Sequence, residues 1–324
     1  MIGLSDLLGT AGGRFERHSQ ANGVSVDGNV VVGESLSSQG GTQAFRWTTS
    51  GGIVGLGYLA GGSSESRAFG VSADGGVVVG GGRSASGAEA FRWTENGGMI
   101  GLGDLPGGVF SSAANAVSAD GNVVVGYGRS SSGIEAFRWT ESGGMIGLGD
   151  FAGRGFHSEA LGVSADGSIV VGMGVSASGP EAFLWSPRDG MIGLGDLPGG
   201  FNDVQFESQA NGVSADGGVV VGFGTSASGR EAFVWTPSGG MISLWNLLQT
   251  RSVNPTSGNW SALIEATGIS SDGRYVAGYG THNGNTEAFL LDFGAASVPE
   301  PNAYWAAGAL LAWRAFAWRS RRPR

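Results

Sequence analysis

One ten-residue segment recurs through most of this chain and limits what the chain can fold into. Its clearest copy, residues 117–126, reads Val-Ser-Ala-Asp-Gly-Asn-Val-Val-Val-Gly. Six copies occur, and their aspartates are Asp27, Asp74, Asp120, Asp166, Asp216 and Asp272, at spacings of 47, 46, 46, 50 and 56 residues. A period of this length predicts a repeat architecture in which each copy belongs to one supersecondary unit.

Each copy lies in a longer unit, and the six units begin near residues 1, 53, 99, 145, 191 and 241. In the unit that begins at Met99 we predict four short strands, over residues 99–105, 113–118, 123–128 and 135–140. The triple valine of the third strand is apolar on both faces, which is typical of a strand buried between two layers. In the fourth strand, Phe137 and Trp139 share one face because side chains alternate along a strand.

Four consecutive strands joined by tight Asp-Gly and Ser-Gly turns are typical of a β-propeller blade. One blade cannot bury both of its faces, so blades must pack on one another, and six are enough to close a ring. The sequence therefore predicts an all-β fold, a β-propeller of about six four-stranded blades, over residues 1–294. The alternative is a β-helix or β-roll solenoid, in which each unit would consist of two unlike coils.

Composition excludes several classes of protein. Glycine supplies 64 of the 324 residues without a Gly-X-Y period, which argues against collagen. Cysteine is absent, so neither a disulfide framework nor a thiolate metal site can form. Before residue 298 the chain holds 13 arginines against 26 acidic residues, and a nucleic-acid partner is not expected for so acidic a body.

The C-terminal segment, residues 295–324, has a different composition. Pro299, Glu300 and Pro301 precede an apolar run over residues 303–318 that is interrupted by Arg314. Sixteen helical residues span ~24 Å, against ~30 Å of hydrocarbon in a bilayer. We predict a short apolar helix that inserts into a membrane, with the cytoplasmic end marked by Arg319, Arg321, Arg322 and Arg324. The alternative is an amphipathic or disordered tail.

Two parts of the chain resemble known families. The order Pro-Glu-Pro, apolar run, arginine cluster resembles the PEP-CTERM sorting signal, which implies a bacterial envelope protein whose tail is recognised and cut by an exosortase. The body resembles the HAF family of probable extracellular repeats, through its Leu-Gly-x-Leu and Ser-x-Asp-Gly segments and its repeated Ala-Phe. The residue before Ala-Phe is Gln43, Glu89, Glu135, Glu181, Glu231 or Glu287. This resemblance implies an extracellular location and carries no activity with it.

The repeated carboxylates are expected to be structural. One aspartate per turn is too few for the 6–8 oxygen ligands of calcium, whereas an aspartate readily closes its own turn. The glutamate before Ala-Phe occurs in five of the six units, although one active site would need carboxylates at particular units. The three histidines, His18, His157 and His282, lie in different units without metal-ligand spacing. We therefore predict no metal, no cofactor and no catalytic residues.

The loop after Leu-Gly-x-Leu varies most between units, and corresponding loops of a propeller project from one rim. Candidate binding residues on this rim are Arg14, Arg17, His18, Arg154, His157, Asp203, Arg251 and Trp260. Drift in the length of solvent-exposed loops would explain the same variation.

These observations predict a non-enzymatic cell-envelope or secreted protein that binds extracellular polysaccharide or surface proteins through one rim. The alternative is a glycan-acting hydrolase or lyase, which would need carboxylates from different blades ~5–10 Å apart. Export needs a leader that residues 1–20 do not supply, and Met1 coincides with a methionine of the repeat. We therefore expect further in-frame sequence upstream, encoding another repeat strand and a signal peptide.

Overall fold

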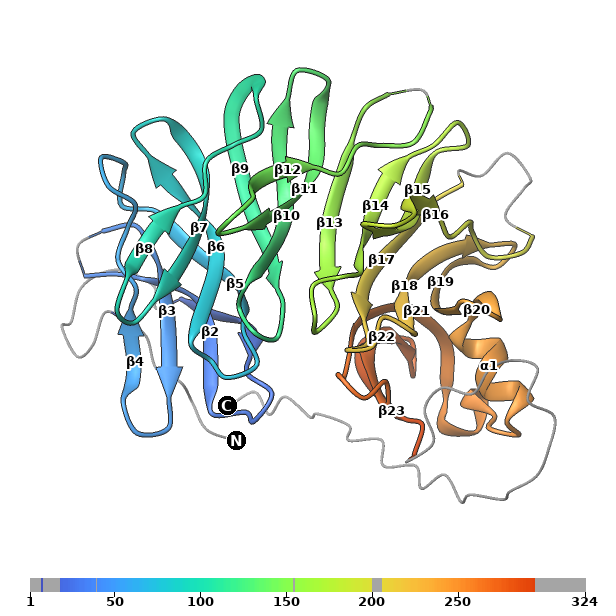
Figure 1. Cartoon of the computed structure of the whole chain (residues 1–324). Coiled ribbons are helices and arrows are strands. Elements are labelled where there is room, and N and C mark those ends of the chain that lie inside the picture. Colours follow the sequence, from blue (N-terminus) through green and yellow to red (C-terminus); the bar gives the residue numbers. More distant parts are fainter. Residues whose placement is uncertain (1–6, 8–17, 39, 154, 200–205, 295–324) are drawn as a thin grey trace. The chain divides into compact units, whose positions relative to one another are not determined.

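The computed structural model describes residues 7, 18–38, 40–153, 155–199 and 206–294. In this part of the chain nearly all regular structure is β, with one short α-helix and one 3-10 helix (Figure 1). The chain divides into two compact units, Met1–Gly193 and Leu194–Arg324, which we call unit 1 and unit 2. The predicted C-terminal helix and its sorting motif lie outside the described residues.

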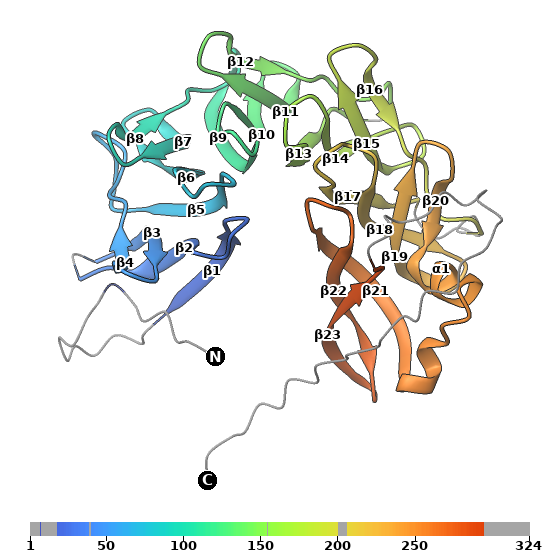
Figure 2. The same cartoon turned by 60° about the horizontal axis from the view of Figure 1, so that its bottom comes forward.

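Unit 1 contains four antiparallel groups of four strands each, which we call its first to fourth sheets in chain order, and the second and third are joined into one eight-stranded sheet. Their strands are β1 (Ser19–Val24), β2 (Val30–Leu36), β3 (Thr42–Thr48) and β4 (Gly52–Gly55); β5 (Ser66–Val71), β6 (Val77–Ser84), β7 (Gly87–Thr94) and β8 (Gly98–Gly101); β9 (Gly107–Val117), β10 (Val123–Ser130), β11 (Gly133–Thr140) and β12 (Gly144–Gly147); and β13 (Ser158–Val163), β14 (Val170–Val175), β15 (Pro180–Ser186) and β16 (Gly190–Gly193). A single parallel bridge, Ala88 to Ser111, joins the second sheet to the third. The first strands β5, β9 and β13 lie side by side (Figure 2).

Unit 2 contains two further sheets. The first has four strands, β17 (Ser208–Val213), β18 (Val220–Ser226), β19 (Gly229–Thr236) and β20 (Gly240–Ser243). The helix α1 (Leu244–Thr250) and the 3-10 helix η1 (Pro255–Gly258) then lead to a sheet of three strands, β21 (Trp260–Ile269), β22 (Tyr275–His282) and β23 (Asn285–Asp292).

The sheets do not begin where the sequence units were predicted to begin. The Met-Ile-Gly-Leu segment, expected to be the first strand of a unit, forms the fourth strand of the sheet before it: in β8, Met99 lies opposite Trp93 of β7. The physical reason is local. Gly98, with φ +65°, allows a tight turn directly after β7, and Gly103, with φ +81°, turns the chain away before the predicted strand could reach residue 105. The other three predicted strands agree with β9, β10 and β11 to within a few residues, except that β9 begins six residues earlier.

Repeated antiparallel four-stranded sheets confirm the predicted all-β propeller architecture. The solenoid alternative is wrong, because a parallel β-helix pairs its strands in parallel, whereas here successive strands of each four-stranded group are antiparallel and the parallel pairings among the described residues are two bridges between groups, Ala88–Ser111 and Ile134–His157. The triple valine is buried on both sides, as predicted: Val124 and Val125 point to opposite faces and neither is exposed. In unit 1, clusters of seven or eight buried residues recur with the repeat, each combining side chains of two successive sheets.

Candidate functional site

The repeated turn uses its carboxylate for itself. Ser118 Oγ donates to Asp120 Oδ1 at 2.6 Å, and the same oxygen accepts the Asn122 N–H at 3.0 Å. Ser118 Oγ in turn accepts the Val123 N–H at 3.0 Å. These hydrogen bonds hold the pKa of Asp120 below its usual value, and the hydrogen bond from Ser118 has the largest effect. The other five turn aspartates have lowered pKa values for the same kind of reason, which supports the structural interpretation.

The glutamate before Ala-Phe also bonds to neighbouring parts of the fold. Glu89 Oε1 accepts the N–H of Gly103 at 3.0 Å, and Glu135 Oε1 accepts that of Gly149 at 3.1 Å, so each carboxylate fixes the chain just beyond the fourth strand. In unit 2, Glu231 accepts a hydrogen bond from Ser226 Oγ. None of these contacts resembles a pair of carboxylates facing a common substrate.

Sequence reasoning missed the role of a third carboxylate, in the segment Leu-Gly-Asp-Leu, which reads Leu-Gly-Asp-Phe at residues 148–151. Asp150 Oδ1 accepts the N–H of Phe151 at 2.8 Å and of Val175 at 2.9 Å, while Oδ2 accepts that of His157 at 2.7 Å. Asp196 makes the corresponding bonds in unit 2, where burial raises its pKa. The repetition of this aspartate was the available signal, but the segment was predicted to be strand throughout.

The arginine of Ala-Phe-Arg-Trp was also missed. In unit 1, Arg46, Arg92 and Arg138 each donate from Nε to a glycine carbonyl in the Asp-Gly turn of the next sheet, at 3.0, 3.4 and 3.2 Å. The later sheets carry Leu184 and Val234 instead, and both side chains are buried. Val234 packs in an apolar cluster with residues of the last sheet, so the same position joins sheets by hydrogen bonds in unit 1 and by apolar packing in unit 2.

The densest polar cluster of the described residues that is not part of a repeated turn or loop lies in unit 2, around Glu265 of β21. Its Oε1 accepts from Asn211 Nδ2 at 2.9 Å, and its Oε2 accepts from Arg230 Nη2 at 2.6 Å and from Tyr279 Oη at 2.8 Å. Arg230 also lies over the Phe223 ring, 3.3 Å from Cζ to the centroid. We call Asn211, Phe223, Arg230, Glu265 and Tyr279 the Arg230 cluster.

The Arg230 cluster has an inner side and an outer side. The Glu265 side chain is 14% exposed, whereas that of Arg230 is 41% exposed. The pKa of Tyr279 is raised, first by its hydrogen bond to Glu265 and then by burial. Because Glu265 is already committed to three donors, the cluster suits the positioning of a guanidinium and a phenol for binding more than it suits proton transfer.

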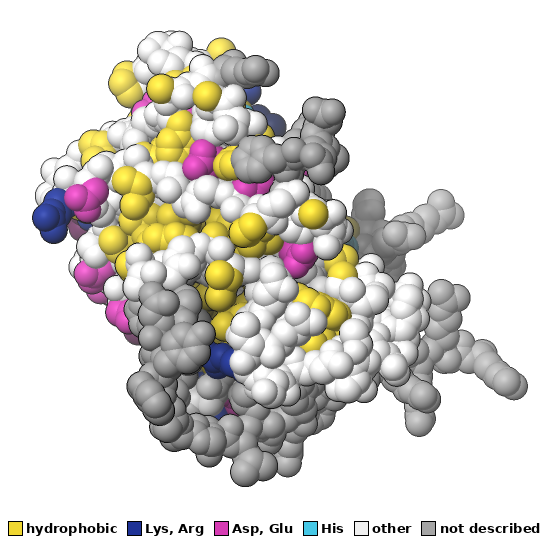
Figure 3. Space-filling view, turned by 90° about the vertical axis from the view of Figure 1, so that its right-hand side faces the viewer, with side chains coloured by type: hydrophobic (Ala, Val, Ile, Leu, Met, Phe, Trp, Pro, Cys, Tyr) yellow, Lys and Arg dark blue, Asp and Glu magenta, His cyan; other side chains and the backbone are white. Residues whose placement is uncertain are grey.

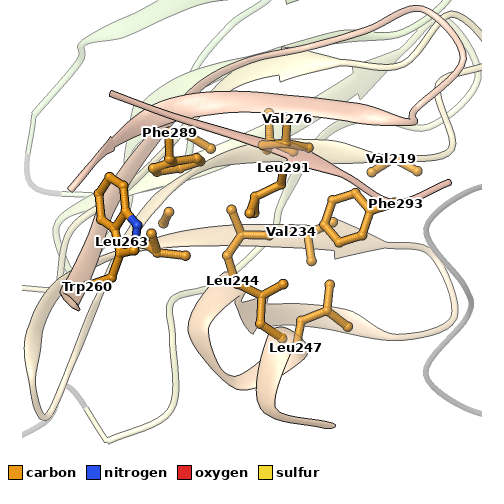
Figure 4. Packing of buried hydrophobic residues seen from close by; sticks show 14 residues of the cluster. Val219, Val234, Leu244, Leu247, Trp260, Leu263, Val276, Phe289, Leu291 and Phe293 are labelled. Atoms are coloured by element: carbon orange, nitrogen blue, oxygen red, sulfur yellow. The ribbon is translucent and has the colours of Figure 1, made fainter. Parts of the chain in front are cut away.

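A second cluster ties the α1–η1 connection to the β22–β23 hairpin. His282 Nδ1 lies 2.8 Å from Glu287 Oε2, and its Nε2 lies 2.8 Å from the Gly258 carbonyl. The Trp260 ring stacks on the imidazole at 4.8 Å and meets Phe289 edge-on. This arrangement holds the long connection onto the last sheet, and Figure 4 shows Trp260 at one end of the large apolar cluster there.

The structure places the predicted rim residues in different environments. His18 is exposed and its carbonyl accepts the Leu36 N–H, and His157 Nε2 lies 2.8 Å from Glu159 Oε1. Arg251 Cζ lies 5.0 Å from the centroid of the Phe293 ring, and burial lowers the pKa of the Arg251 guanidinium. Trp260 is 7% exposed and is a core side chain, which differs from its predicted rim position. Outside the described residues are Arg14, Arg17, Arg154, Asp203, Pro299, Glu300, Pro301, Arg319, Arg321, Arg322 and Arg324.

Within the described ranges, no group of three or more histidine or acidic side chains could hold a metal ion. No helix in the same residues is long and apolar enough to cross a bilayer. On the side seen in Figure 3, charged side chains are few and scattered among apolar and uncharged ones.

No protein-family model matches the sequence, and no curated relative matches it. Among solved structures, puromycin hydrolase aligns with 85% of this chain at 15% identity and a TM-score of 0.51, and a prolyl endopeptidase with 86% at 9% identity and 0.50. TolB from Acinetobacter baumannii aligns with 68% at 12% identity and 0.47. The aligned parts are 43%, 41% and 52% of those chains, so this chain spans about half or less of each. Likeness at such identities extends to the fold alone, and the fold is that of a β-propeller.

Proposed function

We propose that this protein is a non-enzymatic cell-envelope or secreted repeat protein whose propeller binds an extracellular polysaccharide or a surface protein. One observation carries the proposal: the repeated carboxylates, which a glycan-cleaving enzyme would need for acid–base chemistry, are bonded to their own turns and loops. Asp120, Glu135 and Asp150 represent the three kinds, and each accepts hydrogen bonds from nearby backbone N–H groups. Carboxylates held in this way stabilise the fold and are poorly placed to meet a substrate.

The Arg230 cluster is the binding element that we assign to unit 2. A guanidinium stacked on Phe223 and paired with Glu265 is held in one orientation, so little conformational entropy remains to be lost when a ligand binds. Arg230 keeps donors that Glu265 does not use, and Tyr279 adds an aromatic ring with a hydroxyl. Hydroxyl and carboxylate groups of a saccharide are acceptors that such donors fit.

The test combines binding with turnover on the full chain. Binding to immobilised neutral and carboxylated polysaccharides is measured for the wild type, Arg230→Gln and Tyr279→Phe, and the same glycans are incubated with protein and analysed for cleavage. We expect Arg230→Gln to weaken binding about tenfold, which corresponds to about 1.4 kcal/mol. Arg188→Gln, at a side chain that is 92% exposed in a turn of unit 1, is the matched control and should bind as the wild type.

Two results would contradict the proposal. Cleavage of any glycan, retained after repurification and abolished by a carboxylate substitution, would identify the protein as a glycan-acting hydrolase or lyase. Binding that is unaffected by Arg230→Gln but present in the wild type would move the binding surface away from the Arg230 cluster.

We further propose that residues 298–324 direct the protein to the envelope through an exosortase. The support is the sequence order of Pro299–Pro301, the apolar run and the arginine cluster. Fused to a neutral reporter in a host that has an exosortase, this tail should carry the reporter to the membrane fraction and then be removed. Arg314→Leu should increase membrane retention, since an arginine within a spanning helix costs up to ~3 kcal/mol. A reporter that stays soluble and uncut would contradict the proposal.

A further inference from the structure

The first strand of each four-stranded sheet contains a β-bulge, and the chemistry of the bulge residue alternates from sheet to sheet. In chain order the bulge residues are Asn22, Phe69, Asn115, Leu161 and Asn211. A bulge re-aims the side chain of its extra residue, so this position decides what the first strand presents to its neighbour. Asparagine and a large apolar side chain occupy the position in turn.

Each of the three asparagines makes the same contact with the following sheet. Its Nδ2 donates to the carbonyl of an alanine in the first strand of that sheet, at 2.9 Å. The donor and acceptor residues are Asn22 and Ala68, Asn115 and Ala160, and Asn211 and Ala266. The residues directly before these alanines are Arg67, Glu159 and Glu265. A charged side chain therefore lies beside the asparagine link at each of these interfaces.

The interface between the second and third sheets, which has Phe69 at the bulge, is apolar instead. A Cβ atom added to Gly81 of β6 would lie 3.5 Å from Ala113 Cβ and 3.8 Å from the Phe69 ring. Gly81 and Ala113 hold the positions that Glu34 and Arg67 hold one interface earlier. Polar and apolar interfaces thus alternate within unit 1.

At two of the polar interfaces, a shielded carboxylate holds a more exposed guanidinium. Between the first and second sheets, Arg67 Nε lies 3.1 Å from Glu34 Oε2, and the side chains are 47% and 14% exposed. In the Arg230 cluster the arginine comes from the earlier sheet and Glu265 from the later one, yet the exposed fractions are nearly the same, 41% and 14%. Both interfaces present an oriented guanidinium to solvent. We call Asn22, Glu34 and Arg67 the Arg67 site.

The interface between the third and fourth sheets has a histidine in place of the arginine. His157 Nε2 lies 2.8 Å from Glu159 Oε1, and the His157 side chain is again the more exposed of the two. The His157 N–H donates to Asp150 Oδ2 and its backbone bridges to Ile134, so the residue is held at the interface. An ionised carboxylate can only accept, so this contact places a proton on Nε2 and leaves Nδ1 of the neutral ring as an acceptor. We call Asn115, His157 and Glu159 the His157 site.

We infer that the Arg67 site, the His157 site and the Arg230 cluster are three equivalent binding sites for the hydroxyl groups of a neutral saccharide. This inference rests on the proposed function and extends it from one cluster to three. A hydroxyl both donates and accepts, so it fits the guanidinium donors and also Nδ1 of His157, whereas a carboxylate cannot donate. Each arginine is already paired with a carboxylate, in a chain of formal net charge −9, and both facts disfavour a polyanion.

The test counts bound saccharide on the full chain. Dextran, laminarin and galactomannan are screened as neutral polymers and alginate as a carboxylated one. A tetrasaccharide of the neutral polymer that binds is then titrated by equilibrium dialysis. We expect three tetrasaccharides per wild-type chain, one for each site.

Substitutions then assign the sites. Arg67→Gln, His157→Ala and Arg230→Gln should each lower the count to two, because the altered site weakens about tenfold and leaves the titrated range. The triple variant should bind none. Arg188→Gln, at the exposed turn of unit 1, is the matched control and should keep three. Urea denaturation of each variant shows whether it is folded.

The wild-type count needs no substitution, so it decides the question even if a variant fails to fold. A count below three overturns the three-site inference, and it leaves the proposed function intact if the remaining binding is lost in Arg230→Gln. Binding of alginate alone, or three sites that survive all the substitutions, also overturns it. A chain that binds none of the four polymers contradicts this inference together with the polysaccharide form of the proposed function.

Discussion

The third sheet of unit 1 and the last sheet of unit 2 are copies of one repeat that are stabilised in different ways. The third sheet, β9–β12, joins its neighbours by hydrogen bonds that recur with the period, such as Arg138 Nε to Gly167 O and Asn115 Nδ2 to Ala160 O. The last sheet, β21–β23, has Leu290 at the arginine position and contributes to a single cluster of fourteen buried residues together with α1 (Figure 4).

The two sheets also differ in how charge is used. In the last sheet, Arg274 replaces the small residue that follows the turn glycine and forms two hydrogen bonds with Asp292, at 2.7 and 2.9 Å. The third sheet has Asn122 at that position, and Asn122 only braces Asp120. The comparison teaches that a repeat can keep its strands and its turn while the contacts that join it to its surroundings are replaced, provided that apolar area is buried instead.

The largest effect is expected from the aromatic core. Phe137→Ala removes a fully buried ring between two sheets of unit 1 and should cost about 3–5 kcal/mol of unfolding free energy. Phe289→Ala in the last sheet should cost about 1 kcal/mol less, because that buried ring is still 7% exposed whereas Phe137 is fully buried. Urea denaturation measures both. Equal losses would show that the two cores are equally rigid and would break the comparison.

The turn serine should come next. Ser118→Ala leaves the buried Val123 N–H without its acceptor and should cost about 1–3 kcal/mol. The equivalent Ser270→Ala, at a turn that is more open to water, should cost less than about 1 kcal/mol because solvent can bond the Tyr275 N–H. Ser118→Thr, which keeps the hydroxyl, is the control. A larger loss at Ser270 would contradict the burial argument.

The asparagine links between sheets should have smaller effects. Asn115→Ala removes one bond to Ala160 and should cost about 0.5–1.5 kcal/mol. Asn211→Ala in unit 2 also removes a donor from Glu265, so we expect a loss of up to about 3 kcal/mol. Thermal unfolding of the two variants and of the double variant distinguishes them. If Asn115→Ala destabilised the protein more than Asn211→Ala, the hydrogen bond from Asn211 would not be needed to stabilise the buried Glu265 carboxylate.

Lowering the pH should reduce the contribution of each aspartate turn to folding stability by a small amount. The folded-state pKa of Asp120 is lowered by its hydrogen bonds, so its contribution to stability is complete above about pH 4, the unfolded value, and is lost as the pH falls through the lowered pKa. Asp196 has the opposite sign: burial raises its pKa, so stability falls as the pH rises through that pKa. Denaturation midpoints between pH 3 and 6 should depend less on pH in Asp120→Asn. An unchanged slope would exclude the turn carboxylate as a source of acid sensitivity.

Much of the fold could be predicted from the sequence because the relevant interactions are local. The Asp120 turn closes on residues two positions away, and the alternation of Val124 and Val125 fixes which faces are buried. The spacing at which the turn aspartates recur, from Asp27 to Asp272, then sets the number of sequence repeats. The aspartate of the Leu-Gly-Asp loop was equally visible as a repeat, but the N–H partners of Asp150 range from the adjacent Phe151 to Val175 at the end of β14, 25 residues away, so its role could not be predicted.

The sequence by itself determined the all-β propeller class, the number of repeats, the turn chemistry and the buried valines, because each depends on the spacing of residues within or between the repeats. Only the tertiary structure decided to which sheet the Met-Ile-Gly strand belongs, that Trp260 is a core side chain, and that Asn211, Arg230 and Tyr279 meet at Glu265. The physical reason is separation along the chain: Asn211 and Glu265 are 54 residues apart, and no local periodicity specifies which side chains from two different sheets come into contact.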